Sequence, residues 1–234
     1  MKILVTGATR GIGRAIADKL SEIGKIFVTG RNETLLKSIP YIEDYCVCDL
    51  TQDITQLIDF IKTNEIDVLV NNAGEYIYSP IDKINDKDVE NIYNTNLISP
   101  VKLISSAVPH MKSQHWGKII NIGSISGVMG EAGASLYSST KSGLIGLTKA
   151  LALELAEYNI TVNTINPGWV DTDLGSNSIE EGDFSKEEII QCIPQRRFVE
   201  PKEIAALVKY LISEEAKGIT GQSINICAGL SVGI

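Results

Sequence analysis

The sequence predicts an α/β fold in which helices cover both faces of a parallel sheet. Short apolar runs of strand length alternate along the chain with helical patterns of about a dozen residues. The alternation continues from one end to the other, with no internal repeat, low-complexity segment or linker. Strand–helix–strand units of this kind form right-handed crossovers, which make the strands parallel and place the helices against the sheet. A single domain over residues 1–234 is the simplest organisation.

The predicted strands are short apolar runs bounded by polar residues, glycines or helical patterns. They lie at residues 2–6, 25–29, 44–48, 67–71, 118–123, 161–165 and 223–226. The predicted helices place apolar residues three or four positions apart, which is the helical period. They lie at residues 11–23, 32–38, 51–63, 85–113, 135–158 and 201–213. We expect the fourth of these helices to break near Pro100.

A polar stretch at residues 168–195 follows the sixth predicted strand and contains two glycines and several acidic residues. One interpretation is a solvated surface loop. The other is a mobile lid over a site. The lid is favoured because ligands of such sheets bind beyond the carboxyl ends of the strands.

Composition and charge exclude several classes of protein. The chain is 44% hydrophobic and 21% charged, with a formal net charge of −8. That charge disfavours nucleic acid and anionic membrane surfaces as main partners. No apolar run reaches the length of a membrane-spanning helix, and polar residues interrupt the N-terminal segment too soon for a signal peptide. We therefore expect a cytoplasmic protein.

The four cysteines are Cys46, Cys48, Cys192 and Cys227. Their spacing suits neither a zinc site nor a redox Cys-x-x-Cys pair. We expect reduced structural thiols and no metal site.

A glycine-rich turn follows the first predicted strand and opens the first predicted helix. Residues 6–13 read TGATRGIG, with glycines at Gly7, Gly11 and Gly13. Glycines let the backbone turn sharply and approach a ligand closely, and a helix N-terminus offers N–H groups to a diphosphate. This context predicts a dinucleotide site. The alternative is a tight connection with no ligand.

The end of the second predicted strand indicates which dinucleotide is bound. A free ribose 2′-hydroxyl calls for an acidic residue there. The chain has no carboxylate at this place and continues with Arg31, while Arg10 lies in the glycine turn. Two guanidinium groups suit a 2′-phosphate. The sequence therefore predicts NADPH over NADH, the alternative being that Arg31 is merely exposed.

Tyr137 and Lys141 lie four residues apart within a helical pattern, hence one turn apart on one face. A tyrosine with an ordinary pKa near ~10 is a poor acid–base group at neutral pH. A lysine ammonium one turn away is expected to lower that pKa, which makes the pair a candidate general acid/base. Taken alone, the pair is better interpreted as part of an ordinary amphipathic helix, with a tyrosine at its buried edge and an exposed lysine. Tyr137 is, however, the only one of eight tyrosines with a lysine four residues on.

Further short motifs follow in a fixed order along the chain. They are Asn71-Asn72-Ala73-Gly74, Asn96, Ser124, Tyr137-x-x-x-Lys141 and Pro167-Gly168. Together with the glycine turn they resemble the short-chain dehydrogenase/reductase family over essentially the whole length. The spacing from Ser124 to Tyr137 and the segments 193–205 and 219–222 resemble its 3-oxoacyl-(acyl-carrier-protein) reductase branch. The resemblance implies a seven-stranded parallel Rossmann sheet and hydride transfer between a nicotinamide and a carbonyl or alcohol carbon.

The resemblance also implies roles for four residues. Tyr137 would protonate the developing alkoxide, and Lys141 would tune the tyrosine and bind the nicotinamide ribose. Ser124 would polarise the substrate carbonyl, and Asn96 would hold a water that links Lys141 to solvent. Two alternatives stay open, because Ser124 could be a turn residue and Asn96 could be an ordinary polar helix residue.

The cofactor site implied by the resemblance draws on most of the predicted strand ends. Asp49 would contact the adenine and the backbone at Val170 the nicotinamide carboxamide. Thr172 would contact either the carboxamide or a phosphate, and Asn72 and Gly74 could be structural. The full set is Gly7, Thr9, Arg10, Gly11, Ile12, Gly13, Arg31, Asp49, Leu50, Asn72, Ala73, Gly74, Tyr137, Lys141, Pro167, Gly168, Val170 and Thr172.

Partners follow from the resemblance with one departure. Carrier-protein reductases grip the acidic carrier with basic residues, whereas the matching positions here hold His115 and Tyr158. The basic residues that could compensate are Lys112, Lys118, Arg196 and Arg197. The substrate is therefore a 3-oxoacyl thioester or an unrelated small ketone, alcohol or sugar. A homotetramer (or homodimer) is expected, and a non-catalytic dinucleotide-binding regulator is the minor alternative.

Overall fold

The computed structural model describes residues 1–172, 175 and 185–232 of the chain. Its seven strands form one parallel sheet in the order β3-β2-β1-β4-β5-β6-β7. The strands are β1 (Lys2–Thr6), β2 (Lys25–Gly30), β3 (Ile42–Val47), β4 (Val68–Asn71), β5 (Gly117–Ile122), β6 (Ile160–Pro167) and β7 (Ser223–Ile226). The predicted seven-stranded parallel sheet is confirmed.

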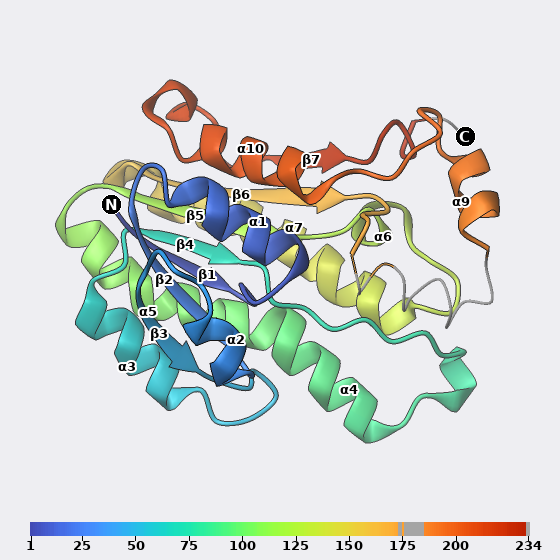
Figure 1. Ribbon diagram of the computed structural model, residues 1–234, viewed down its shortest axis with the longest axis horizontal. Helices are drawn as coiled ribbons and strands as arrows, with labels where there is room; N and C mark the ends of the chain where they lie inside the picture. Colours follow the sequence, from blue (N-terminus) through green and yellow to red (C-terminus); the bar gives the residue numbers. More distant parts are fainter. Residues whose placement is uncertain (173–174, 176–184, 233–234) are drawn as a thin grey trace.

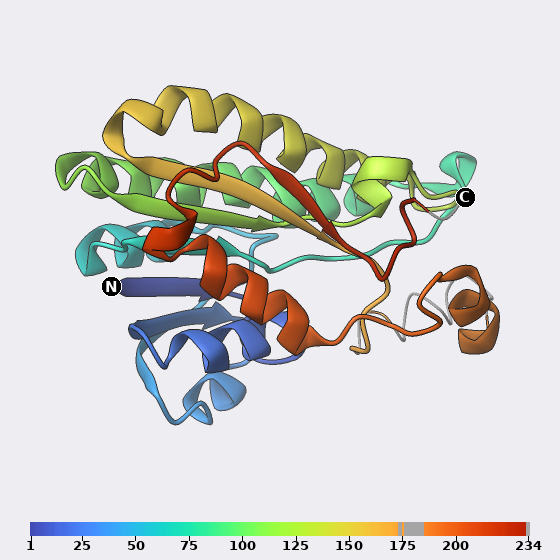
Figure 2. The same cartoon turned by 90° about the horizontal axis from the view of Figure 1, so that it is seen from above.

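Helices cover both faces of the sheet, as predicted (Figures 1 and 2). Strand residues alternate between the faces, so Ile3 and Val5 pack toward α1 and α10, while Leu4 packs toward α3, α5 and α7. The helices are α1 (Gly11–Leu20), α2 (Glu33–Lys37), α3 (Thr55–Asn64), α4 (Asp86–Tyr93), α5 (Ser99–Ser113), α6 (Ser126–Met129), α7 (Ser135–Leu155), α9 (Lys186–Cys192) and α10 (Pro201–Leu211). Among the described residues, no helix is both long enough and apolar enough to cross a membrane.

The long helical segment before β5 differs from its prediction. It does not break near Pro100, because α4 passes into α5 through a π-helical turn at Asn94–Ile98. The ring and the missing N–H of Pro100 disfavour regular α-helical bonding in the preceding turn, and the widened π turn accommodates this. The turn carries Asn96, whose side chain is buried.

Within the described part of the chain, the α-helices α6 and α9 are absent from the sequence prediction. The four-residue α6 is too short to show a helical period, and α9 lies inside the polar stretch at 168–195. A capping box of Ser185 and Glu188 starts α9, and only Ile189 is buried in it. The predicted lid also includes residues 173–174 and 176–184, which lie outside the described residues.

The strand order reverses between β1 and β4. The chain runs outward from β1 to β3, crosses back to β4, and continues in the other direction to β7. The connections that leave β1 and β4 therefore diverge, which opens a crevice beyond their carboxyl ends. In Figure 1 the arrowheads of β4, β6 and β7 point toward this end, where α6 and α9 also lie.

Candidate active site

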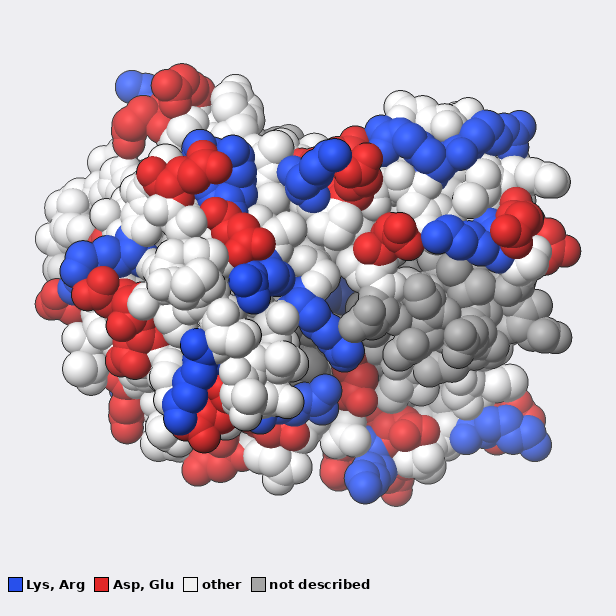
Figure 3. All heavy atoms as spheres, viewed as in Figure 1, with Lys and Arg blue, Asp and Glu red and all other residues white. Residues whose placement is uncertain are grey.

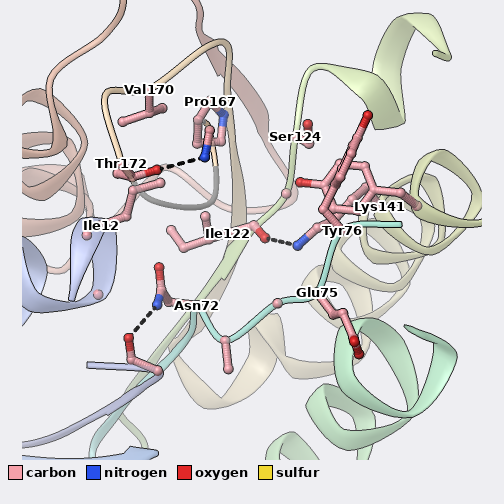
Figure 4. A pocket seen from close by; sticks show the side chains of 18 of the residues that line it. Ile12, Asn72, Glu75, Tyr76, Ile122, Ser124, Lys141, Pro167, Val170 and Thr172 are labelled. Carbon is pink, nitrogen blue, oxygen red and sulfur yellow. Dashed lines mark hydrogen bonds between the residues drawn. The ribbon is translucent and has the colours of Figure 1, made fainter. Parts of the chain in front are cut away.

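A cavity of about 870 Å³ opens beyond the carboxyl ends of the strands. Its walls come from the turns after β1 to β6, the start of α7, and α9. Every residue predicted for the cofactor or the chemistry lines it except Asn96. In Figure 4, Ser124, Lys141 and Tyr76 lie on one side and Ile12, Val170 and Thr172 on the other. The volume is that of a site for a ligand of cofactor size.

The glycine turn needs its glycines. Gly7 and Gly11 have φ of +65° and +55°, which favours glycine over other residues. A Cβ on Gly13 would lie 2.3 Å from the carbonyl oxygen of Gly7 and 2.4 Å from Nδ2 of Asn72. The turn therefore packs directly against the segment that follows β4.

The same turn leaves α1 open for an anion. Arg10 is the N-cap residue, no side chain caps the helix, and its first turn has no acidic residue. Backbone N–H groups at such an end attract a phosphate. The residues present thus fit the diphosphate of a dinucleotide.

Asn72 has the structural contacts that the sequence left open. Its Nδ2 donates to the carbonyl oxygens of Thr6 at 2.8 Å and Gly7 at 3.3 Å. The hydroxyl oxygen of Thr6 accepts from the backbone N–H groups of Asn72 and Ala73, both at 2.9 Å. These bonds tie β1 to β4 at the reversal point and set the floor of the cavity between them.

The arginines and the third strand define the far end of the cavity. Arg10 and Arg31 both line it, from the glycine turn and the end of β2. Asp49 also lines it, and its carboxylate accepts from the backbone N–H of Thr51 at 3.0 Å and its hydroxyl at 2.9 Å. Among the described residues, this end holds the predicted pair of guanidinium groups.

The other end gathers the predicted catalytic side chains. Ser124, Tyr137 and Lys141 are all buried, with only 8%, 9% and 4% of their surface exposed. Nζ of Lys141 donates to the carbonyl oxygen of Ile122 at 3.0 Å and lies 5.5 Å from the ring centroid of Tyr137. The helical spacing thus places Tyr137 and Lys141 together, beside Ser124 in the loop after β5.

Asn96 lies behind this group and does not line the cavity. Its side chain accepts from the backbone N–H of Glu75 and donates to the Glu75 carbonyl, both at 2.8 Å. It also donates to the hydroxyl of Thr140 at 3.2 Å. Gly74 separates it from Lys141, because a Cβ there would be 3.5 Å from Asn96 Oδ1 and 3.4 Å from Lys141 Nζ.

The ionisation of the pair differs from the prediction. Burial raises the pKa of Tyr137 to about 12, although a hydrogen bond with Ser124 acts in the lowering direction. Burial also lowers the pKa of Lys141 to about 8. The expectation that Lys141 lowers the pKa of Tyr137 is wrong, because the loss of hydration on burial is the largest influence on the pKa of each of the two side chains. Tyr137 is therefore protonated at neutral pH.

Several cavity residues were not predicted. Tyr76 packs edge-on against Tyr137, with ring centroids 5.0 Å apart, and bonds to Glu131. Ser126 bonds to Ser124 and Glu131. An apolar part of the wall comes from Met129, Trp169, Ile189 and Leu230. Trp169 and Ile189 belong to the stretch at 168–195 that the sequence predicts as a lid, although neither is singled out there. The others lie on loops and short helices without periodicity, so only their closeness in sequence to predicted residues could have indicated them.

The residues considered for carrier-protein contact lie elsewhere. His115 and Tyr158 precede β5 and β6, at the end of the sheet opposite the cavity, with ring centroids 5.9 Å apart. Lys118 is only 2% exposed and Arg197 bonds to Glu203. Lys118 therefore cannot compensate for a missing basic residue. Figure 3 shows Lys and Arg interspersed with Asp and Glu over the face in view.

Comparison with known proteins decides the family. A sequence model described as short chain dehydrogenase matches residues 1–183. The chain belongs to the short-chain dehydrogenase family. Family membership explains why the glycine turn, the Tyr137–Lys141 pair and the reversed strand order occur together.

Curated relatives within the family include the 3-oxoacyl-(acyl-carrier-protein) reductase FabG of Rickettsia prowazekii. The two sequences are 36% identical over an alignment of 234 positions, which covers 97% of this chain and 95% of the relative. The FabG protein of Aquifex aeolicus is also 36% identical, with coverage of 97% and 96%. The resemblance to this branch is thereby confirmed.

Two solved structures have the same architecture. One is YwfH, an NADPH-dependent reductase involved in bacilysin biosynthesis, with a TM-score of 0.92, 30% identity and coverage of 100% of this chain and 99% of that one. The other is an actinorhodin polyketide ketoreductase variant with NADPH, with a TM-score of 0.90, 34% identity and coverage of 99% and 97%.

Proposed function

We propose that this protein is an NADPH-dependent reductase that converts a carbonyl group to an alcohol, with 3-oxoacyl thioesters as its substrate class. The observation that carries the proposal is the buried group of Ser124, Tyr137 and Lys141 in the same cavity as the glycine turn. The relatives named as 3-oxoacyl-acyl-carrier-protein reductases and the NADPH-dependent neighbours support it.

The cofactor would lie across the cavity. The glycine turn and the N-terminus of α1 would bind its diphosphate, with Arg10 and Arg31 at the 2′-phosphate and Asp49 and Leu50 at the adenine. Residues 72–74, Pro167, Gly168, Val170 and Thr172 would hold the nicotinamide half. The bound cofactor supplies the hydride.

The side chains would supply the proton and the polarisation. Tyr137 is protonated at neutral pH and would donate to the alkoxide oxygen as charge develops there. The hydrogen of Ser124, which points to Ser126 in the structure, would turn by rotation of the hydroxyl to donate to the same oxygen. Lys141, held by the Ile122 carbonyl, would bind the nicotinamide ribose. Asn96 would position the backbone at Glu75 and a water on the path from Lys141 to solvent.

The apolar part of the wall supports an acyl substrate over a sugar. Met129, Trp169, Ile189 and Leu230 would contact a hydrocarbon chain beside the reacting carbonyl. Small ketones and alcohols, the alternative expected from the sequence, are the second candidate class of substrate. A non-catalytic regulator is disfavoured, since both Tyr137 and Lys141 are present.

The partner predictions extend the proposal. Docking of an acidic carrier protein has weak support, because Lys118 is buried and because His115 and Tyr158 precede β5 and β6, at the end of the sheet opposite the cavity. A homotetramer or homodimer has support from the outer faces of α5 and α7, where apolar side chains are exposed. The cytoplasmic location stays a prediction.

A kinetic panel tests the substrate class. NADPH oxidation would be followed with acetoacetyl thioesters and longer 3-oxoacyl thioesters, next to small ketones of similar polarity. We expect kcat/KM to rise with chain length over the first few carbons, since each buried CH₂ contributes about 0.8 kcal/mol. Turnover of small ketones only would reassign the protein to the second class, and no turnover on the panel would contradict the reductase.

A further inference from the structure

Glu131 lies between α6 and α7 and lines the same cavity as Ser124 and Tyr137. Its carboxylate accepts two short hydrogen bonds, from the hydroxyl of Ser126 at 2.6 Å and from that of Tyr76 at 2.7 Å. An ionised carboxylate has no hydrogen to donate, so both hydroxyl groups must point their hydrogens at it. The two bonds lead toward the two reacting side chains from opposite directions.

The first bond reaches Ser124. Because the hydrogen of Ser126 is used toward Glu131, the hydroxyl of Ser124 is the donor in the 3.2 Å contact between the two serines. The backbone N–H of Ser126 donates to the oxygen of Ser124 at 3.1 Å. The two contacts with Ser126 thus hold the oxygen of Ser124 in place beside Tyr137, with which Ser124 also forms a hydrogen bond.

The second bond reaches Tyr137. The ring of Tyr76 packs edge-on against that of Tyr137, at 5.0 Å between centroids and 69° between planes. The backbone N–H of Ser79 donates to the carbonyl oxygen of Gly133 at 2.6 Å, which fastens the same two loops a few residues away. The hydroxyl of Tyr76 is anchored on Glu131, so the ring that supports Tyr137 has one orientation.

The charge of Glu131 also acts on Tyr137. It raises the tyrosine pKa in the same direction as burial. The other titratable side chains that pack on Tyr137 or face it across the cavity are Lys141 of α7, Tyr76 of the loop after β4, Tyr93 of α4, and Glu188 and Cys192 of α9. Glu75, next to Tyr76, also lines the cavity, and burial raises the pKa of its carboxyl.

We propose that Glu131 is a positioning residue for carbonyl reduction, which aligns Ser124 through Ser126 and Tyr137 through Tyr76 and keeps the tyrosine in its proton-donating form. The proposal rests on the reductase function proposed above. It explains why a carboxylate lines a cavity that would bind an uncharged acyl chain.

Two substitutions separate geometry from charge. Glu131→Gln removes the charge at nearly constant size, and Glu131→Asp keeps the charge but withdraws the oxygens from Ser126 and Tyr76. We expect kcat for reduction to fall about tenfold in both, with KM for NADPH unchanged. Glu90→Gln removes the same charge from the exposed surface of α4 and is the matched control, expected to leave kcat unchanged.

The pH dependence of the reduction rate distinguishes an effect of the Glu131 charge on Tyr137 from a mere loss of packing around Glu131. A negative neighbour disfavours the phenolate, so its removal lowers the pKa of Tyr137. Reduction needs the protonated tyrosine, so the rate of Glu131→Gln should begin to fall at a lower pH than that of the wild type. Glu131→Asp should follow the wild-type pH profile at a lower rate.

A substrate-free measurement keeps the proposal separate from the proposed function. Carbon-13-labelled tyrosine would be titrated by NMR in the full chain with NADP⁺, and the Tyr137 signal assigned with Tyr137→Phe. We expect this signal to titrate at a lower pH in Glu131→Gln than in the wild type. A protein that turns over no carbonyl but shows this shift would contradict the reductase and support only the effect of the Glu131 charge on Tyr137. An unchanged titration would overturn the role of Glu131, whether kcat falls or stays within about twofold.

Discussion

Tyr137 sits where hydration is lost, and that loss decides its ionisation. Burial raises its pKa to about 12 and lowers that of Lys141 to about 8. Two ionisable groups that are pushed in opposite directions by the same desolvation are both biased toward their neutral forms. The protonated tyrosine is the form that can donate to an alkoxide. The side chains of the site by themselves thus keep Tyr137 in the protonated form that reduction of a carbonyl requires.

Arg31 gives a prediction at the same scale. Arg31→Asp replaces a group suited to a 2′-phosphate with one that repels it, so the NADPH/NADH ratio of kcat/KM should fall by at least about tenfold. Initial rates with each cofactor at subsaturating concentration would measure the ratio. Arg196→Asp makes the same charge change at an exposed residue away from the cavity and serves as the control. An unchanged ratio in Arg31→Asp would sink the assignment of NADPH.

Spacing and order along the chain predicted the residues of the cavity well. The glycine turn and the Tyr137–Lys141 pair are local patterns whose geometry follows from a turn or from one helix. Ser126, Glu131 and Tyr76 could not be predicted in the same way, because two loops bring them together. The ionisation of Tyr137 was predicted wrongly, since spacing gives the neighbour but not the extent of burial.

At the scale of elements, the strands and long helices follow the hydrophobic periodicity to within a few residues. The exceptions have physical causes. The π turn at Asn94–Ile98 replaces a break near Pro100, and the short helices α6 and α9 carry too few buried residues to show a period. Periodicity reports a helix face that is buried over several turns. It says little about helices of four to seven residues that close a cavity.

The outer face of α7 leads to a prediction about assembly. Leu153 is 85% exposed, three residues after the exposed Ala150, and a groove beside this face is lined by Val101, Val108 and Leu151. If α5 and α7 pair with a second copy, burial of Leu153 contributes about 1.5–3 kcal/mol per copy. Leu153→Glu should therefore shift the protein toward smaller species in sedimentation equilibrium.

A control for this change is Ile81→Glu, which alters a residue that is 74% exposed but lies before α4. Its assembly should match that of the wild type. A wild-type protein that sediments as a monomer would contradict the predicted oligomer, and equal assembly of both variants would exclude the α7 face as its interface.

At the scale of the molecule, one topological feature organises the site. The sheet reverses its order between β1 and β4, and Asn72 ties the two strands together there. Ile12 of the glycine turn lies on one side of this point and Ser124 and Lys141 lie on the other (Figure 4). A dinucleotide bound along the crevice would join the two halves. Neither half alone indicates a reductase, and the proposed function depends on their meeting in one cavity.

The replacement of Tyr137 by phenylalanine tests this account most directly. The change removes only the hydroxyl, so NADPH binding measured by fluorescence titration should stay near that of the wild type. The rate of NADPH oxidation with a 3-oxoacyl thioester should fall by about a hundredfold or more, the contribution of a positioned general acid. Retained turnover with intact binding would contradict the role of Tyr137 as the proton donor and, with it, the proposed mechanism.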